Sequence, residues 1–183
     1  MKRLILVSVI LSILLAGSAL GFDGDRKGFV LGGGLGIAPM AKWSVELGSD
    51  DYDEENTGLA LHILIGGAID EKNMIVYEGN ATAYTTDILD KTAAQSFNGA
   101  VWYHYFGNTG KSAFTAVGLG FYSFKVEDFD ANDPGLGILL GGGYEFSKHW
   151  QFGAYLSFGK TTEASVFDYK HSQISLLIST VAF

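Results

Sequence analysis

The sequence feature that most constrains the fold is a pair of glycine-rich and aromatic-rich segments of strand length between positions 135 and 159. The second half of this stretch divides into an apolar set and a set of small or polar residues: Phe152, Ala154, Leu156 and Phe158 against Gly153, Tyr155, Ser157 and Gly159. Successive side chains of a β-strand point to opposite faces, so this spacing predicts a strand with one apolar face. Residues 147–150 join it to a preceding segment of the same kind, which predicts a β-hairpin.

Comparable segments recur along the chain and predict eight strands. Besides the hairpin, which supplies the sixth and seventh strands, they occupy residues 28–40, 59–69, 74–86, 96–106, 113–126 and 173–183. Longer loops are predicted at 41–56, 87–95, 127–134 and 161–169, and short turns at 70–73, 107–112 and 147–150. An even number of antiparallel strands, with short turns on one side and longer loops on the other, is typical of outer-membrane barrels.

The interior of such a barrel is predicted to be filled. Eight strands enclose a space only just wide enough for side chains, and four bulky ones are expected to point inward: Tyr84, Trp102, Tyr122 and Tyr155. The chain has 25 glycines, many at inward positions, which leave room for these rings. An open aqueous pore is therefore not expected.

The N-terminus reads as a secretory signal peptide, residues 1–21. Lys2 and Arg3 precede an apolar run at 4–15, and small residues follow. Cleavage is expected after Gly21, with cleavage after Ala19 as the alternative. Lys2 and Arg3 are removed with this segment, which leaves 10 of the 12 basic residues. Against 20 acidic residues, residues 22–183 therefore carry a net charge of −10. An acidic exported chain is a poor candidate for binding nucleic acid.

The second half of the chain resembles a known family. TAVGLGFYSF at 115–124, GLGILLGGGYEFSKHWQFGAYLSF from residue 135 and the closing HSQISLLISTVAF are similar to the small outer-membrane β-barrel family that includes the OmpA barrel, OmpX and the opacity-type proteins. We therefore expect an all-β fold: an eight-stranded antiparallel up-and-down transmembrane β-barrel at 22–183, preceded by a cleaved signal peptide. The resemblance implies an outer-membrane location, with both termini in the periplasm.

The same resemblance implies the role of the protein and its partners. Family roles range over surface adhesion, envelope integrity and narrow or hydrophobic conduits, with outer-membrane lipid and lipopolysaccharide as surroundings. The terminal Phe183 resembles the signal that the barrel-assembly machinery recognises. Placing Phe183 toward lipid also turns Ser179 outward, whereas the face with Leu176 and Ile178 is the more apolar. A bulge would reconcile the two, and both registers of the last strand stay open.

A set of ionisable residues is predicted to face the lumen, namely His62, Glu78, His104 and Glu145. Ionisable groups at membrane depth are costly and often functional, which is the argument for a proton-linked or gated path. The favoured interpretation is a hydrogen-bonded network that closes the barrel, because buried polar groups need partners in either case. We expect Glu78 or Glu145 to hydrogen-bond to a histidine or to be protonated, with Lys125 as the main cation of the lumen.

Two acidic loops are candidate cation sites. They contain Asp50, Asp51, Asp53, Glu54 and Glu55 in one, and Glu127, Asp128, Asp130 and Asp133 in the other. Several carboxylates can hold Ca²⁺ or Mg²⁺. The spacing lacks the EF-hand pattern, so we favour a surface that divalent ions screen against lipopolysaccharide phosphates.

Aromatic residues near strand ends are expected to form the two interfacial girdles of a membrane barrel: Trp43, Tyr103, Tyr105, Phe146, Trp150, Phe152, Phe158, Phe167 and Tyr169.

Catalysis is not expected. Some barrels of this size modify lipid A with a Ser and a His, which draws attention to Ser165, Asp168, His171 and Ser172. Neighbouring residues of a strand point to opposite faces, so His171 and Ser172 are not expected to meet. The chain has no cysteine, which excludes thiolate metal sites and Cys nucleophiles, and no cofactor is predicted.

The favoured function is a structural or surface-interaction role in the outer membrane. The first alternative is a narrow or hydrophobic channel of the OmpW kind. The second is a soluble periplasmic barrel of lipocalin type, against which the apolar outward face of residues 59–65 counts.

Overall fold

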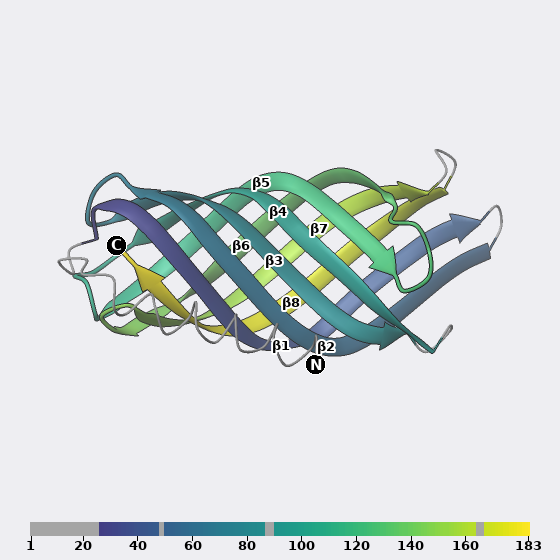
Figure 1. Cartoon of the computed structure of the whole chain (residues 1–183), viewed down its shortest axis with the longest axis horizontal. Helices are drawn as coiled ribbons and strands as arrows, with labels where there is room; N and C mark the ends of the chain where they lie inside the picture. Colours follow the sequence, from purple (N-terminus) through teal and green to yellow (C-terminus); the bar gives the residue numbers. More distant parts are fainter. Residues whose placement is uncertain (1–25, 48–49, 87–89, 164–166) are drawn as a thin grey trace.

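The chain forms one closed β-barrel of eight strands (Figure 1). The computed structural model describes residues 26–47, 50–86, 90–163 and 167–183, so the predicted signal peptide at 1–21 lies outside the described residues. The strands are β1 (Gly28–Leu47), β2 (Asp50–Ala68), β3 (Asn73–Thr86), β4 (Lys91–Tyr105), β5 (Ser112–Val126), β6 (Asp133–Ser147), β7 (Trp150–Glu163) and β8 (Phe167–Ala182). Each pairs antiparallel with its neighbour in sequence, and β8 pairs with β1. The predicted up-and-down barrel is confirmed.

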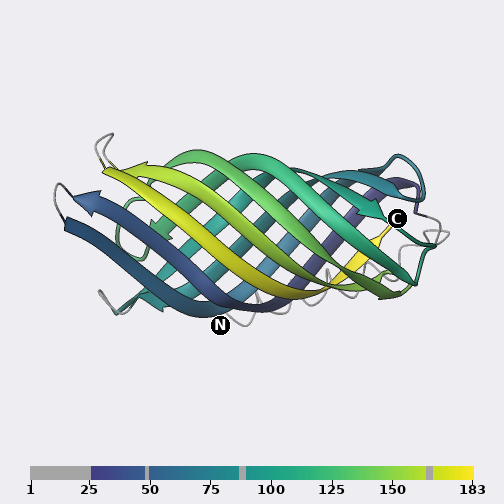
Figure 2. The same ribbon diagram turned by 180° about the vertical axis from the view of Figure 1, so that it is seen from behind.

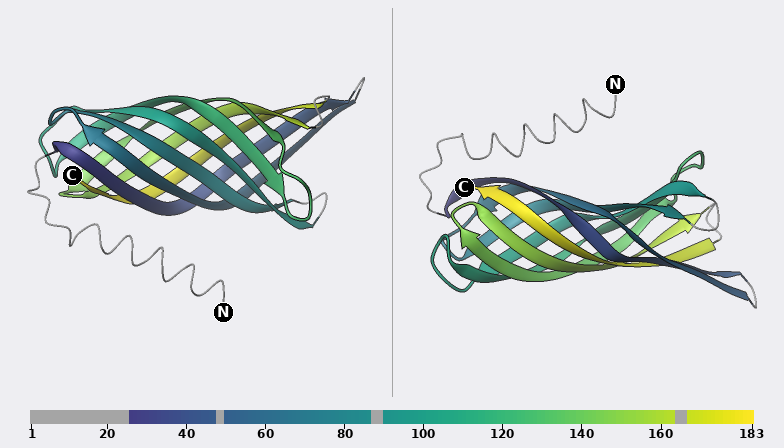
Figure 3. Two further views of the ribbon diagram at one scale, coloured as in Figure 1. Left: turned by 45° about the horizontal axis from the view of Figure 1, so that its top comes forward. Right: turned by 90° about the horizontal axis from the view of Figure 1, so that it is seen from below.

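The barrel has two distinct ends. The start of β1 and the C-terminus lie at one end with the β2–β3, β4–β5 and β6–β7 turns, which we call the terminal end (Figures 1 and 2). The other four connections lie at the opposite end, the loop end. There the β1–β2 hairpin reaches beyond the other strands (Figure 3).

The predicted loops at 41–56 and 161–169 are wrong, whereas the loop predicted at 127–134 is largely confirmed, since β5 ends at Val126 and β6 begins at Asp133. Residues 41–56 are not a loop, because β1 and β2 stay paired from Ala41↔Asn56 to Leu47↔Asp50. In the same way β7 runs to Glu163, and β8 begins at Phe167. Once a hairpin is aligned, its backbone hydrogen bonds can continue past the apolar wall whatever the side chains are. Water on both faces removes the alternation by which a strand is recognised in sequence.

A β-bulge in β1 determines which side chains enter the mouth of the barrel. The pairing of β1 with β2 shifts between Ala38 and Ala41, around Pro39, which has no N–H to give to the ladder. Before the shift, Val30 and Ala38 face inward, and after it Ala41 and Val45 do. The bulge therefore turns Trp43 toward the lumen.

The outer face of the barrel is apolar. Each of the eight strands exposes at least one large apolar side chain, with Leu59 74%, Leu136 69% and Leu119 64% exposed. A wall of this kind is suited to acyl chains rather than water and counts against the lipocalin alternative. The described residues contain no helix long and apolar enough to cross a membrane, and that finding has no bearing on a crossing made by strands.

The lumen is filled with side chains, as predicted. Its largest buried rings are Tyr103, Tyr105, Tyr122, Tyr155 and Phe97, all 0–1% exposed. Small residues make the room: a Cβ added to Gly153 would lie 2.7 Å from Cε2 of Tyr155.

The inward direction predicted for Trp102 is wrong. Its side chain is 48% exposed on the outer face, while its neighbours Val101 and Tyr103 face the lumen. Aromatic residues occupy both faces of β4, so hydrophobicity alone could not set its register.

The last strand keeps its apolar face outward throughout. Leu176 and Ile178 are exposed, whereas Ser175, Ser179 and Phe183 are buried inside the barrel. No bulge interrupts β8 in its pairing with β7. Of the two registers left open by the sequence, the structure has the one in which Phe183 points inward.

Candidate functional site

His62, Glu78 and Ser179 form the centre of a buried polar network. Nδ1 of His62 lies 3.2 Å from Oε1 of Glu78, and its Nε2 lies 2.7 Å from Oγ of Ser179. The hydroxyl of Tyr103 donates to Oε2 of Glu78 at 2.6 Å. The His62 and Glu78 side chains are both fully buried. A carboxylate and a histidine thus share a hydrogen bond, as expected for one of the two glutamates.

The network continues across the lumen from β3 to β8 and β5. Oδ1 of Asn80 accepts from Nε2 of Gln173 and from Oγ of Ser175, both at 3.1 Å. Tyr122 in turn donates to Oε1 of Gln173 at 3.3 Å. Because strands on opposite sides of the barrel supply these groups, the hydrogen bonds cross the lumen at mid-height and close it.

Glu145 lies nearer the terminal end and pairs with Arg26. Nη2 of Arg26 lies 2.6 Å from Oε2 of Glu145, and the N–H of Gly110 donates to the same oxygen at 2.7 Å. The guanidinium covers the ring of Tyr105 at 3.6 Å and also donates to the carbonyl of Glu71. These contacts form a second closure of the lumen.

Sequence reasoning missed Arg26. It belongs to the short polar segment before β1, which carries no strand pattern. Lys125, expected to be the main cation of the lumen, is instead exposed on the outer face. Arg26 could have been found from the need of the buried Glu145 for a cation. It precedes β1 by two residues and therefore lies at the end of the barrel where Glu145 is buried.

His104 does not belong to the lumen, and its prediction as a lumen residue is wrong. Its Nδ1 lies 3.0 Å from Oδ1 of Asn73, which also accepts from Nε1 of Trp102 at 3.1 Å. The ring of Phe106 packs edge-on against it at 4.9 Å. His104 therefore joins an outer aromatic cluster at the terminal end. The reason is the register of β4, which places odd-numbered residues inside.

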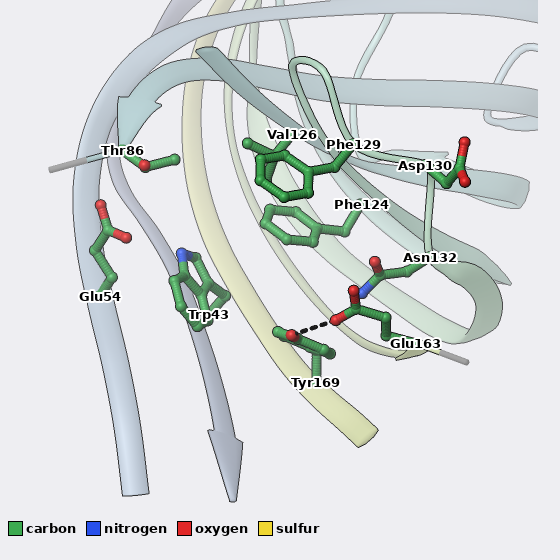
Figure 4. A pocket seen from close by; sticks show the side chains of 10 residues that line it. All are labelled: Trp43, Glu54, Thr86, Phe124, Val126, Phe129, Asp130, Asn132, Glu163 and Tyr169. Carbon is green, nitrogen blue, oxygen red and sulfur yellow. Dashed lines mark hydrogen bonds between the residues drawn. The ribbon is translucent and has the colours of Figure 1, made fainter. Parts of the chain in front are cut away.

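A cavity of about 170 Å³ opens at the loop end of the lumen (Figure 4). Its lining comes from six strands and the β5–β6 loop: Trp43, Glu54, Thr86, Phe124, Val126, Phe129, Asp130, Asn132, Glu163 and Tyr169. The assignment of Trp43 and Tyr169 to a lipid-facing girdle is thus wrong, and so is that of Tyr103 and Tyr105, which are fully buried.

Three rings of the lining pack against one another on one side of this cavity. The centroid of Trp43 lies 6.2 Å from that of Phe124 and 5.9 Å from that of Tyr169. The Phe124 and Tyr169 centroids are 6.1 Å apart. The hydroxyl of Tyr169 donates to Oε2 of Glu163 at 2.6 Å, which fixes the outer side of the aromatic wall.

The acidic residues at the loop end are dispersed. Asp53 pairs with Lys42 at 2.8 Å and Asp128 with Lys91 at 2.7 Å, and the hydrogen bond from Lys91 holds the pKa of Asp128 below its ordinary value. In the described part of the chain no three acidic or histidine side chains are grouped to hold a metal ion. The side chains of Asp50 and Asp51 lie outside the described residues.

The residues considered for catalysis are not brought together. His171 faces the lumen, where its Nε2 lies 2.8 Å from Oγ1 of Thr161. Ser172 lies on the other face of β8, and Asp168 is exposed at the rim, where it accepts from Thr162. Ser165 lies outside the described residues.

An apolar wall, a lumen closed by hydrogen bonds and eight antiparallel strands define the fold of the small eight-stranded outer-membrane barrels. Among solved structures the chain is similar to Neisserial surface protein A, with a TM-score of 0.56 and 16% identity over 84% of this chain and 96% of that one. At this identity the likeness establishes the fold alone.

Two further solved structures resemble the chain less. They are Ail, the attachment invasion locus protein of Yersinia pestis (TM-score 0.48, 12% identity, 83% of this chain and 98% of that one), and OprG from Pseudomonas aeruginosa (TM-score 0.48, 14% identity, 87% and 98%). No family model and no curated protein matches the sequence.

Proposed function

We propose that the protein is a closed barrel of the outer membrane with a structural or surface-interaction role, inserted with its loop end outward and its termini in the periplasm. The observation that carries this function is the double closure of the lumen. The network around Glu78 crosses it at mid-height, and the Arg26–Glu145 pair crosses it near the terminal end. A solute would have to break both to pass.

The two faces of the molecule support a role at the loop end. Over its central part the wall offers mainly apolar side chains to the bilayer, with Asn98 hydrogen-bonded to Tyr77 and Ser96, while hydrogen bonds cross the lumen inside it. The hairpin of β1 and β2 projects furthest and carries polar side chains such as Lys42, Asp53 and Glu55 (Figure 3). Exposed carboxylates at this height would meet lipopolysaccharide phosphates through divalent cations.

Phe183 fits a role in assembly. Its side chain is 1% exposed, with His149 packed against its ring at 5.0 Å. Recognition of Phe183 by the barrel-assembly machinery would therefore precede closure of the barrel and end with it.

Conductance in planar bilayers tests the closed lumen. The purified protein is expected to give no discrete current steps, and outer-membrane fractionation is expected to recover it in a form whose gel mobility changes on heating. A variant that removes both closures, with Arg26→Ala and Tyr105→Ala near the terminal end and Glu78→Ala and Tyr103→Ala at mid-height, is expected to show brief openings. Tyr77→Ala, which removes a ring from the outer face, is the matched control and should stay silent. Stable current steps in the unaltered protein would overturn the proposal and favour the channel.

A further inference from the structure

We propose that the cavity at the loop end is a binding site for a small organic cation of the quaternary ammonium class, such as choline. This inference goes beyond the closed structural role, because a barrel that does not conduct need not bind anything. Both its walls and its charge lead to this ligand.

The lining of the cavity is largely aromatic. Trp43, Phe124 and Tyr169 lie around the cavity, with Phe129 of the β5–β6 loop covering it from one side (Figure 4). The centroids of Trp43, Phe124 and Tyr169 lie 5.9–6.2 Å apart, so these three rings pack against one another and form one continuous aromatic wall of the cavity. Aromatic faces carry negative potential, and several of them around one space attract methylated ammonium groups more than neutral apolar groups.

The charge of the lining is negative. Glu54, Asp130 and Glu163 contribute to it, and no lysine, arginine or histidine does among the described residues. A cation gains from these carboxylates at a point partly shielded from water, and an anionic ligand is disfavoured. The acidic lining thus selects against the phosphate of a phosphocholine headgroup and favours the free cation.

A buried donor points to a polar atom on the ligand. Nε1 of Trp43 is buried and has no acceptor among the described residues. An unpaired buried N–H costs stability, and a ligand hydroxyl could accept from it. Choline carries such a hydroxyl beside its trimethylammonium group.

The protein already places one cation over a ring of this lining. Nζ of Lys91 lies 5.4 Å from the centroid of Phe129 while it pairs with Asp128. On the side of Phe124 away from the loop end the lumen is filled with rings, because His171 packs against Phe124 at 4.9 Å and stacks on Tyr122 at 5.2 Å between centroids. These rings close the lumen below the site, so a ligand would enter from the loop end.

Trp43 provides a direct readout. Trp102→Phe and Trp150→Phe together leave Trp43 as the sole tryptophan of the chain. Titration of this variant in detergent with choline is expected to change the Trp43 fluorescence saturably. The neutral isostere, in which carbon replaces the nitrogen, should bind at least about tenfold more weakly. Phosphorylcholine is expected to bind more weakly than choline; the reverse order would still support the ammonium site and would identify a lipid headgroup as its source.

Calorimetry on single variants assigns the binding to the cavity. Trp43→Leu and Tyr169→Leu are each expected to weaken choline binding about tenfold, whereas Phe167→Leu, a rim aromatic outside the lining, should not. Two independent wall variants are used so that one misfolded variant, recognised by its gel mobility on heating, leaves the other. The proposal is overturned by absence of saturable choline binding, by equal affinity for the neutral isostere, or by unchanged affinity in the folded wall variants. None of these outcomes bears on whether the barrel conducts.

Discussion

Glu145 is buried near the terminal end of the lumen between two donors, the guanidinium of Arg26 and the N–H of Gly110. The desolvation of both charges is offset by their mutual contact and by the ring of Tyr105 beneath the guanidinium. A pair of this kind adds little net stability compared with an apolar pair, yet it is costly to break from one side. The distinction can be measured.

Arg26→Met is expected to destabilise the barrel by about 3–5 kcal/mol, because it leaves Glu145 as a buried charge without its cation. The double variant Arg26→Met and Glu145→Met should lose much less. Urea titration of the protein in detergent, followed by gel mobility, measures both.

The neighbouring exposed residue gives the control for this experiment. Lys27→Met removes the same charge from the adjacent position, which is exposed, and should leave stability nearly unchanged. An equal loss of stability in the single and double variants would show that the unpaired charge of Glu145 is not the cause of the destabilisation.

At the scale of the element, the β2–β3 turn has the clearest local cause. Oδ1 of Asp70 accepts from the N–H groups of Lys72 and Asn73 at 2.8 and 2.9 Å, and also from Nδ2 of Asn73. The Asn73 side chain foremost, and then the N–H of Lys72, hold the pKa of Asp70 below its ordinary value of 3.8. These bonds fix the turn and with it the register of the two strands.

The turn should therefore lose stability in acid. Because the pKa of Asp70 is lower in the folded state, its contribution is present above the unfolded value and is lost as the pH falls through the folded one. Asp70→Ala is expected to remove this component, so the variant should be less stable than the parent at neutral pH, and the difference should shrink as the pH falls through the pKa of Asp70 in the folded protein. Unfolding midpoints in urea at a series of pH values measure the difference, and a pH-independent difference would count against the turn.

The elements also separate what the sequence predicts from what it does not. Strands with an apolar outer face and a small or polar inner one, such as β2 and β7, were predicted with the correct faces, because lipid and lumen impose opposite chemistry. β4 was not, since Trp102 and Tyr103 are equally suited to a girdle and to a filled lumen. The continuation of β1 beyond residue 40 was missed because it depends on pairing with β2.

The candidate sites divide in the same way. His62, Glu78 and Glu145 were expected in the lumen and lie there, but the partners of the glutamates depend on contacts between residues far apart in sequence. The cavity at the loop end could not be predicted from the sequence. Trp43 faces inward only because of the bulge at Pro39, which the sequence pattern does not show.

For the molecule as a whole, closure depends on the seam between β1 and β8. Gly34 of β1 lies against Ser179 of β8 and His62 of β2, and an added Cβ would lie 2.7 Å from Nε2 of His62. A branched side chain there would displace both partners of the central network. β1 and β8 could then pair only after one of the two strands had shifted.

Gly34→Val is accordingly expected to reduce strongly the fraction of protein that reaches the heat-modifiable form. The fraction is measured by gel mobility after refolding into detergent. Gly67→Val is the matched control, since a Cβ at Gly67 would lie 3.5 Å from its nearest neighbour. Equal yields from both variants would show that the seam tolerates the added volume.

The contact between Arg26 and Glu145 joins positions 119 residues apart in the chain. It cannot form until β6 has been synthesised and brought round to the start of β1, so it belongs to the last events of folding rather than the first. Until then the side chain of Arg26 is accessible to trypsin, and afterwards it is buried in the lumen. Protection of Arg26 from trypsin therefore reports when the barrel has closed.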